Sequence, residues 1–211
     1  MKSFFKEACV ENLDQALKAE AKGADRIELC ANLELGGLTP SRELIVDASQ
    51  QLNIPLRIMI RPRGGDFIYS AEEIRNMIGS IEFCKTIGVE GVVFGILDSD
   101  RKLNLELIKQ LTNIATPLKV VIHKAIDHSI KPLEGLGELI KIKGITSVLT
   151  SGGAQTAMEG KETIKEMLQL CGGGGIEIVP AGKITNDNVH ELHEYFGAKT
   201  YHGKRIVGDL S

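Results

Sequence analysis

Residues 54–70 read Ile54-Pro-Leu-Arg-Ile-Met-Ile-Arg-Pro-Arg-Gly-Gly-Asp-Phe-Ile-Tyr-Ser70. The apolar, β-branched run at 54–60 predicts a strand, and Pro62 ends it because proline fixes φ and has no backbone N–H. The sequence Ser70-Ala-Glu-Glu73 has the spacing of a capping box and predicts the start of a helix. The segment is therefore a strand, a loop and a helix start, which together form the repeating unit of parallel α/β folds.

The same unit recurs along the whole chain. Short apolar runs predict strands at 4–9, 26–30, 56–60, 91–95, 119–123, 147–151, 177–181 and 199–202. Longer amphipathic runs predict helices at 13–22, 41–51, 71–87, 105–112, 132–142, 161–171 and 188–196. This alternation predicts an α/β fold with a single (β/α)8 TIM-type barrel domain over residues 1–211, whose working end is the carboxyl-terminal face of the strands. An open doubly wound sheet is the alternative.

The last unit of this barrel looks incomplete. Only the nine residues Gly203-Lys-Arg-Ile-Val-Gly-Asp-Leu-Ser211 follow His202, too few for a full eighth helix. We therefore expect a short or missing final helix. Its groove would be covered by something else, such as a second subunit, or would stay partly bare, and this makes a homodimer the expected assembly.

Composition describes an ordinary soluble globule. The chain is 43% hydrophobic and 25% charged with a net charge of -3, so no basic excess points to nucleic acid or an anionic membrane. The apolar stretch at the amino terminus is too short and is interrupted too soon by charged residues to be a signal peptide. No apolar run in the sequence is long enough to span a membrane. We expect a cytoplasmic protein. Its four cysteines show no disulfide framework and should be free thiols there.

The strand patterns place ionisable side chains inside the barrel, because alternate residues of a barrel strand face the helices and the interior. In 26–30, Ile27 and Leu29 would face the helices while the other three residues point inward. The inward set over all strands includes Glu7, Cys9, Arg26, Glu28, Cys30, Arg57, Met59, Arg61, His123, Glu177, Thr200 and His202. Buried charges are costly unless paired, so these residues form either an active site or structural Glu–Arg pairs deep in the barrel.

The loop after the third strand suggests an enzyme. Gly64-Gly65 would let the backbone fold back so that Arg61, Arg63 and Asp66 converge, although a plain surface loop held by an Arg–Asp pair is the alternative. Arg61 and Arg63 would bind an anionic group.

Other residues at the same end of the barrel would complete such an enzyme. Acid–base roles fall to Glu28, Asp66 and Asp127, with His123 as proton shuttle. The turn Ser151-Gly152-Gly153 would offer backbone N–H groups to a phosphate, which is weak evidence by itself. The sequence has no Walker loop, and no GxGxxG motif follows the first strand, so nucleotide binding is not indicated.

Two cysteines suggest a metal site instead. Glu7-Ala-Cys9 and Glu28-Leu-Cys30 repeat the pattern Glu-x-Cys at the ends of adjacent strands, and paired thiolates are soft ligands suited to Cu(I). Against this hypothesis, neighbouring barrel strands are staggered, so the two sulfurs need not meet, and a free cysteine is often a small core residue. No cluster of the zinc type is present in the sequence.

Taken together, the motifs resemble those of the CutC copper-homeostasis proteins, almost end to end. The matching stretches are Glu7-Ala-Cys9, Gly23-Ala-Asp-Arg-Ile-Glu-Leu-Cys30, Gly36-Gly-Leu-Thr-Pro-Ser41, Arg61-Pro-Arg-Gly-Gly-Asp-Phe67 and Leu149-Thr-Ser-Gly-Gly153. The fifth-strand motif of the family, His-Arg-Ala-Phe-Asp, is here His123-Lys-Ala-Ile-Asp127.

This resemblance implies a (β/α)8 barrel, a cytoplasmic oligomer, and a role in copper tolerance through Cu(I) bound by Cys9 and Cys30. It also maps a polar mouth onto Glu28, Arg61, Asp66, His123, Asp127 and Ser151. Two functions remain open: a Cu(I)-binding homeostasis protein, and a barrel enzyme acting on an anionic or phosphorylated small molecule.

Overall fold

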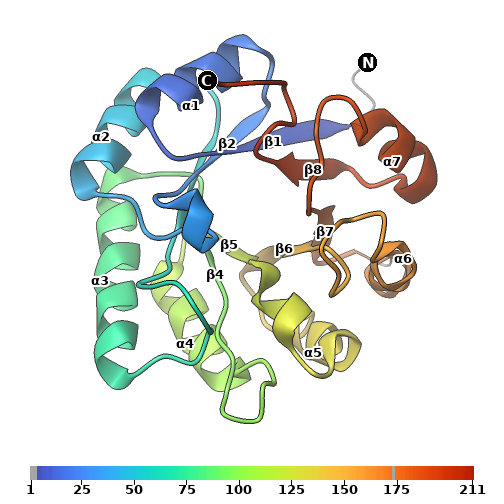
Figure 1. The fold of residues 1–211 in the computed structure, drawn as a ribbon. Coiled ribbons are helices and arrows are strands. Elements are labelled where there is room, and N and C mark those ends of the chain that lie inside the picture. Colours follow the sequence, from blue (N-terminus) through green and yellow to red (C-terminus); the bar gives the residue numbers. More distant parts are fainter. Residues whose placement is uncertain (1–3, 173) are drawn as a thin grey trace.

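Eight parallel strands surround a common centre and helices lie outside them, in a computed structural model that describes residues 4–172 and 174–211 (Figure 1). The strands are β1 Phe5–Val10, β2 Arg26–Leu29, β3 Leu56–Met59, β4 Gly91–Phe94, β5 Lys119–Ile122, β6 Ile145–Thr150, β7 Glu177–Pro180 and β8 Thr200–Gly203. The helices are α1 Leu13–Ala21, α2 Arg42–Gln51, α3 Ala71–Ile87, α4 Leu105–Ala115, α5 Pro132–Leu139, α6 Lys161–Leu170 and α7 Val189–Phe196, with short 3-10 helices η1 Leu33–Leu35 and η2 Lys124–His128.

The strands form a nearly closed barrel, which confirms the predicted fold. Parallel ladders join them in the order β7-β6-β5-β4-β3-β2-β1-β8. Within 4–172 and 174–211, no ladder joins β7 to β8. Beyond the ends of these strands Thr185 and Arg205 form a single parallel bridge, and Asn186 N donates to Arg205 O at 2.9 Å. This bridge draws the two edge strands together at the carboxyl-terminal end of the barrel.

Local sequence signals explain where the elements begin and end. Ser70 accepts a hydrogen bond from the backbone N–H of Glu73, whose side chain in turn accepts from the Ser70 N–H, so α3 begins with the predicted capping box. The same helix ends at Gly88, whose φ of 78° is the left-handed conformation that glycine adopts most readily. Among the described residues no helix is both long and apolar enough to cross a bilayer.

The alternating strand pattern separates two layers of side chains, as predicted. Ile27, Leu29 and Ile58 belong to the large apolar core between the strands and the helices. A second, smaller cluster fills the inside of the barrel and consists of Cys9, Cys30, Met59, Val93, Val121, Leu149 and Val179. The two cysteines therefore lie inside the barrel rather than in the main core.

The chain after β8 runs as turns and irregular backbone, which agrees with the expected absence of a final helix. Ile206, Val207 and Leu210 are nevertheless buried in the large core. Lys22 Nζ, at the end of α1, donates to Asp209 O at 2.5 Å, and the carboxyl-terminal end lies beside α1 (Figure 1). The terminal segment thus fills part of the space that an eighth helix would cover.

Gly203 at the end of β8 lies against the chain that follows β7, which makes it a test of how the barrel closes. A Cβ added there would lie 2.1 Å from Ile184 O, so Gly203→Ala must push the two segments apart. We expect a loss of about 1–3 kcal/mol in the free energy of unfolding, measured by urea denaturation. Gly79→Ala is the matched control: Gly79 lies within α3 with nothing within 4 Å of the added Cβ, and alanine there should raise stability by about 0.5–1 kcal/mol. If Gly203→Ala were as stable as the unchanged protein, this closure would be wrong.

Candidate functional site

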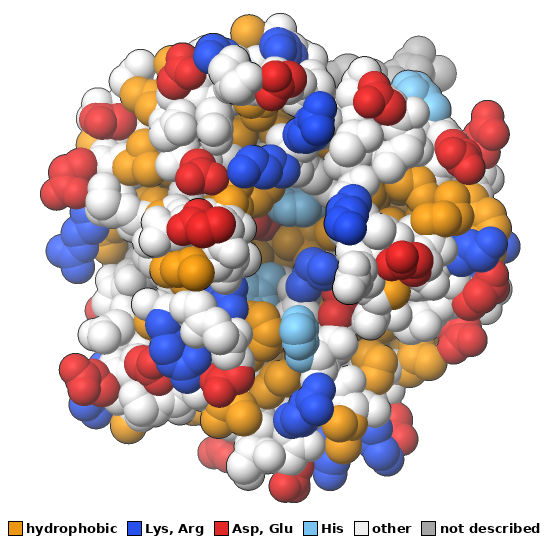
Figure 2. All heavy atoms as spheres, in the orientation of Figure 1, with side chains coloured by type: hydrophobic (Ala, Val, Ile, Leu, Met, Phe, Trp, Pro, Cys, Tyr) orange, Lys and Arg blue, Asp and Glu red, His pale blue; other side chains and the backbone are white. Residues whose placement is uncertain are grey.

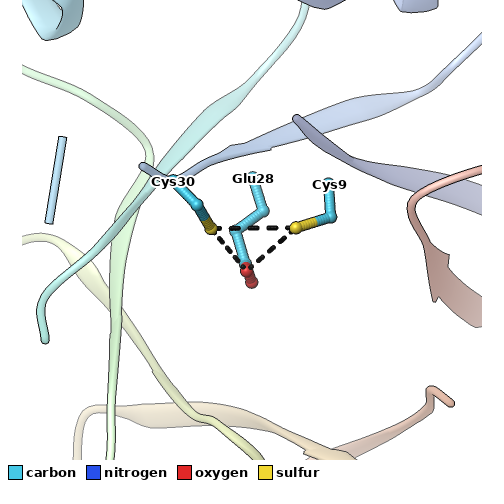
Figure 3. Close-up of side chains that lie close together, drawn as sticks. All are labelled: Cys9, Glu28 and Cys30. Atoms are coloured by element: carbon cyan, nitrogen blue, oxygen red, sulfur yellow. Dashed lines mark hydrogen bonds between the residues drawn. The ribbon is translucent and has the colours of Figure 1, made fainter. Parts of the chain in front are cut away.

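Cys9, Glu28 and Cys30 meet at the carboxyl-terminal end of β1 and β2 (Figure 3). The two Sγ atoms lie 3.7 Å apart, and Glu28 Oε1 lies 3.4 Å from Cys30 Sγ and 3.8 Å from Cys9 Sγ. The β1–β2 register places Cys9 opposite Glu28, so Cys30, two residues further on, points to the same interior side. The stagger of the strands therefore does not keep the sulfurs apart.

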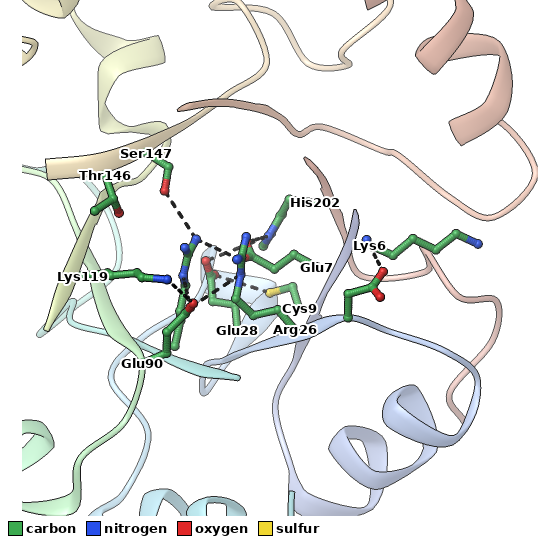
Figure 4. Close-up of polar contacts among 12 residues, drawn as sticks. Lys6, Glu7, Cys9, Arg26, Glu28, Glu90, Lys119, Thr146, Ser147 and His202 are labelled. Carbon is green, nitrogen blue, oxygen red and sulfur yellow. Dashed lines mark hydrogen bonds and ion pairs between the residues drawn. The ribbon is translucent and has the colours of Figure 1, made fainter. Parts of the chain in front are cut away.

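Below the cysteines, Glu7 is the centre of a buried polar network (Figure 4). Its Oε1 lies 2.9 Å from His202 Nδ1, and its Oε2 accepts hydrogen bonds from Arg26 Nε and from Arg57 Nη1, the latter at 3.1 Å. Glu90 extends the network, because its carboxylate pairs with Arg57 Nε at 2.8 Å. The Glu–Arg pairs expected deep in the barrel are thus present.

The surroundings shift the pKa values of Cys9, Cys30 and Glu28 in different directions. The hydrogen bond from Cys30, supported by His202, lowers the pKa of Cys9 to about 5 although burial opposes this. The same hydrogen bond, together with burial, raises the pKa of Cys30 well above its usual value. Burial raises the pKa of Glu28 to about 8. At neutral pH the cluster therefore holds the Cys9 thiolate beside the Cys30 thiol, and burial makes Glu28 harder to ionise than an exposed glutamate.

His202 and Glu7 form a charged pair beneath this cluster. Burial opposes protonation of His202, but Glu28, Cys9 and Glu7 outweigh it and raise the pKa of His202 well above its usual value. Burial likewise opposes ionisation of Glu7, but the hydrogen bond to His202 and the nearby arginines hold the pKa of Glu7 well below its usual range. The pair is therefore an imidazolium and a carboxylate at neutral pH.

A cavity of about 110 Å³ opens above the cysteines at the carboxyl-terminal mouth. Figure 2 shows this face hollowed near its centre, with histidine, lysine and arginine side chains around the hollow. Its lining residues come from most of the strand ends and are Cys9, Glu28, Cys30, Gly36, Met59, Arg61, Phe67, His123, Lys124, Leu149, Ala181 and His202. The cavity thus joins the thiol pair to part of the predicted polar mouth.

His123 lies directly after β5 and is held in one orientation. Its Nδ1 accepts a hydrogen bond from Ala125 N at 3.1 Å, and the ring packs against Gly95, where a Cβ would lie 2.6 Å from Nδ1. Burial, with a contribution from Arg61, lowers the pKa of His123 to about 3. The ring is therefore neutral at physiological pH, and its buried Nε2 has no hydrogen-bond partner among the described residues.

Arg61 lines the cavity, but its terminal nitrogens bind the chain itself. They donate to the backbone carbonyl oxygens of Leu35 at 3.0 Å, Gly37 at 3.4 Å and Gly65 at 2.8 Å. The guanidinium carbon lies 4.6 Å from the centre of the Phe67 ring. Only the buried Nε of this guanidinium has no partner within the described part of the chain.

Arg63 and Asp66 lie outside the cavity, so the expected convergence of Arg61, Arg63 and Asp66 on one point was wrong. Arg63 Nη2 pairs with Asp66 Oδ1 at 3.0 Å, and Arg63 Nε pairs with Glu73 Oε1 at 2.6 Å. Arg61 instead turns inward because carbonyl oxygens of the preceding loop capture its guanidinium. The Arg63–Asp66 pair stabilises the shape of an exposed loop, as the alternative interpretation had it.

Asp127 occupies the turn that was expected to bind phosphate. Its carboxylate accepts hydrogen bonds from Ser151 N at 2.8 Å, Ser151 Oγ at 2.9 Å, Gly153 N at 3.1 Å and Thr150 Oγ1. The backbone N–H of Gly152 donates to Thr150 Oγ1 at 2.9 Å. These donors already have an internal partner, so a phosphate here would first have to displace Asp127.

Sequence reasoning placed Glu7 and His202 inside the barrel without assigning them to a site. In the structure Glu7, Glu28 and His202 form a second group whose ligand atoms lie within 4.8 Å of one another, next to the group of Cys9, Glu28 and Cys30. The inward parity of β1 and β8 was the available signal, since β1 pairs with both β2 and β8.

The depressed pKa of His123 gives a pH-dependent prediction. The unfolded chain binds a proton near pH 6.5, whereas the native ring stays neutral to about pH 3. The contribution of His123 to the free energy of unfolding is therefore highest above pH 6.5, where His123 is neutral in both states, and falls at lower pH, where only the unfolded chain takes up the proton. In His123→Asn the amide oxygen can still accept from Ala125 N, but no group titrates. Between pH 7 and pH 4.5 the stability difference should move by about 2 kcal/mol in favour of the variant, measured by urea unfolding. A difference that stays constant with pH would contradict a neutral buried ring.

The chain is similar in sequence and in structure to known proteins of one family. The CutC family model matches residues 4–207. A human copper homeostasis protein cutC homolog is 41% identical over 199 residues, covering 94% of this chain and 72% of its own length. A CutC family protein of Mesorhizobium japonicum is 40% identical over 196 residues, covering 93% and 75%. The crystal structure of a CutC protein from Streptococcus agalactiae superposes with a TM-score of 0.91 at 32% identity, covering 96% of this chain and 99% of that one.

Proposed function

This chain belongs to the CutC copper-homeostasis family, and from that premise we propose that it binds one Cu(I) ion between Cys9 and Cys30. The observation that carries the proposal is the 3.7 Å separation of the two Sγ atoms inside the barrel. Two thiolates at this spacing are a soft ligand pair, and soft thiolates favour Cu(I) over harder divalent ions.

The residues present fit such an ion. Metal–thiolate bonds are about 2.3 Å long for zinc, and a metal at a similar distance from both sulfurs can bridge a gap of this size. Cys9 is already a thiolate at neutral pH, so binding needs to remove only the proton of Cys30. The Glu28 carboxyl group supplies oxygen beside the pair, 3.4 Å from Cys30 Sγ and 3.8 Å from Cys9 Sγ. Copper here is the cargo of the protein, and the protein supplies a preformed, buried thiol pair.

A competition titration tests this proposal. Reduced protein is titrated with Cu(I) against a competing chelator at neutral pH, and one Cu(I) per chain should be withdrawn from the chelator. Mg²⁺ in excess should leave the affinity unchanged, because this hard ion prefers oxygen ligands to thiolates. Failure to compete, or equal competition by Mg²⁺, would refute a Cu(I) site.

Location and assembly complete the proposal. Free thiols suit a reducing compartment, so we place the protein in the cytoplasm. A homodimer remains the proposed assembly, although Ile206, Val207 and Leu210 already fill part of the groove from which it was inferred. Sedimentation at micromolar concentration should give the mass of two chains, and a single-chain mass would refute the dimer.

A second candidate function is a barrel enzyme acting on an anionic small molecule. The observation that favours it is that Arg61 Nε and His123 Nε2, both buried and unpartnered among the described residues, belong to side chains that line the same cavity. In this function Arg61 binds the anion while Glu28 and His123 handle protons. Arg61→Ala should weaken binding of any such ligand, and an unchanged affinity would count against the enzyme.

A further inference from the structure

Three buried polar atoms without partners belong to residues that line the mouth cavity. They are Arg61 Nε, His123 Nε2 and Glu28 Oε2, and within 4–172 and 174–211 none of them has a hydrogen-bond partner. These residues are at most 5% exposed and follow or lie on three different strands. A buried polar group without a partner costs free energy, so three around one cavity indicate a ligand that supplies the missing hydrogen bonds.

Two of the three atoms are donors. Because His123 Nδ1 accepts from Ala125 N, the neutral ring carries its proton on Nε2. Arg61 Nε always carries a proton. The Phe67 ring fixes both side chains, since it lies 4.9 Å from the His123 ring centre and 4.6 Å from the Arg61 guanidinium carbon. Two fixed donors, one of them cationic, suit the two oxygens of a carboxylate.

The third atom, Glu28 Oε2, needs a hydrogen-bonding partner on the ligand other than the carboxylate. Glu28 Oε2 accepts a hydrogen bond when the carboxyl group is ionised and donates one when it is protonated. A hydroxyl group can both donate and accept, so it satisfies Glu28 in either state. A ligand that carries a hydroxyl next to its carboxylate therefore matches all three atoms.

The size of the cavity limits the ligand further. A volume of about 110 Å³ is that of three or four water molecules at about 30 Å³ each. An acid of roughly five non-hydrogen atoms fills such a space. Lys124 also lines the cavity and adds a second cation at its edge.

We propose that this cavity binds a compact hydroxy carboxylate, with the carboxylate on Arg61 and His123 and the hydroxyl on Glu28. The inference deepens the second candidate function, on which it rests for the charge of the ligand, and it needs no copper.

Glycolate is the probe for this proposal. It is titrated into the reduced, metal-free full chain, and binding is followed by calorimetry and by the NMR signal of the His123 Nε2 proton. Glycolate should bind, whereas glycolamide, which lacks the charge, should bind at least about tenfold more weakly. Acetate, which lacks the hydroxyl, should bind about three- to tenfold more weakly than glycolate. Equal affinity for glycolate and glycolamide, or tighter binding of inorganic phosphate, would overturn the proposal.

A pair of His123 variants separates the cavity donor from the fold. His123→Asn keeps an acceptor for Ala125 N but has no group in the place of Nε2, so glycolate affinity should fall at least about tenfold. His123→Gln keeps a donor near the place of Nε2 and should bind glycolate within about threefold of the unchanged protein. Thermal unfolding of both variants confirms that they are folded. Unchanged glycolate affinity in His123→Asn, or no glycolate binding by the folded protein, would mean that water alone fills the cavity.

Glycolate binding can be tested separately from Cu(I) binding and from enzyme activity. The double variant Cys9→Ser, Cys30→Ser should keep the preference for glycolate over glycolamide of at least about tenfold, since the carboxylate lies on Arg61 and His123. Its absolute affinity for glycolate is not the control, because both cysteines line the cavity and contact Glu28. Loss of Cu(I) binding with glycolate binding retained therefore supports two separate ligands. Glycolate that binds and stays chemically unchanged supports this inference while counting against the enzyme.

Discussion

Replacing both Cys9 and Cys30 by serine should lower Cu(I) affinity by on the order of a thousandfold or more, because hydroxyl oxygen is a poor ligand for a soft ion. Either single replacement should remove most of the affinity, since the two sulfurs 3.7 Å apart act as one ligand pair. The affinities are measured by competition against a Cu(I) chelator under reducing conditions. Serine is close in size to cysteine, so the barrel interior should stay packed.

Cys171→Ser is the matched control for this experiment. Cys171 follows α6, is half-buried, and has no place in the cluster of Cys9, Glu28 and Cys30. Its thiol has a raised pKa because of burial, so it offers no thiolate at neutral pH. Cu(I) affinity should be unchanged in this variant. Equal losses in the control and in the double variant, or none in either, would remove Cys9 and Cys30 as the copper ligands.

The largest effect on stability should come from Glu7→Gln. Glu7 is fully buried and accepts from Arg26, Arg57 and His202. Removing its charge takes the paired carboxylate from the His202 imidazolium and leaves Glu90, of these two carboxylates, to pair with both arginines. Breaking a buried ion pair in this way costs about 3–5 kcal/mol in the free energy of unfolding. Urea denaturation at pH 7 measures the loss.

Asp66→Asn is the control for Glu7→Gln. Asp66 also pairs with an arginine, Arg63, but at the exposed surface, where solvent screens the interaction. Its stability should change little. If Glu7→Gln were no more destabilising than Asp66→Asn, the network inside the barrel would not be one of mutually dependent charges.

The order and parity of the strands could be predicted from sequence because they are local properties. Each strand carries its own alternation, so Ile27 and Leu29 could be assigned to the outer core and Glu28 and Cys30 to the interior before any pairing was known. Turn residues such as Ser70 and Gly88 are equally local signals.

The details of the site depend on contacts between distant residues and could not be predicted. The meeting of Cys9 and Cys30 follows from the β1–β2 register, which no single strand specifies. His202 reaches Glu7 across 195 residues of sequence. Asp127 captures the backbone amide of Ser151 24 residues away, which no motif revealed.

The positions of Arg61 and Arg63 in the loop after β3 also depend on distant contacts and could not be predicted from sequence. Sequence reasoning gave Arg61 and Arg63 one shared role, yet the structure places their guanidinium groups in different surroundings. Carbonyl oxygens of Leu35 and Gly37, more than twenty residues earlier, hold Arg61 inside, whereas Arg63 pairs with Asp66 three residues away. Which of the two enters the mouth depends on a neighbouring loop.

X-ray absorption at the copper edge of the Cu(I)-loaded protein is the most direct test of the copper site. The first shell around the copper ion should be dominated by sulfur, at a distance near the metal–thiolate value of about 2.3 Å known for zinc. Sulfur scattering should disappear in the double variant Cys9→Ser, Cys30→Ser. A first shell made only of nitrogen and oxygen in the unchanged protein would contradict the account, because it would place the ion away from the thiol pair.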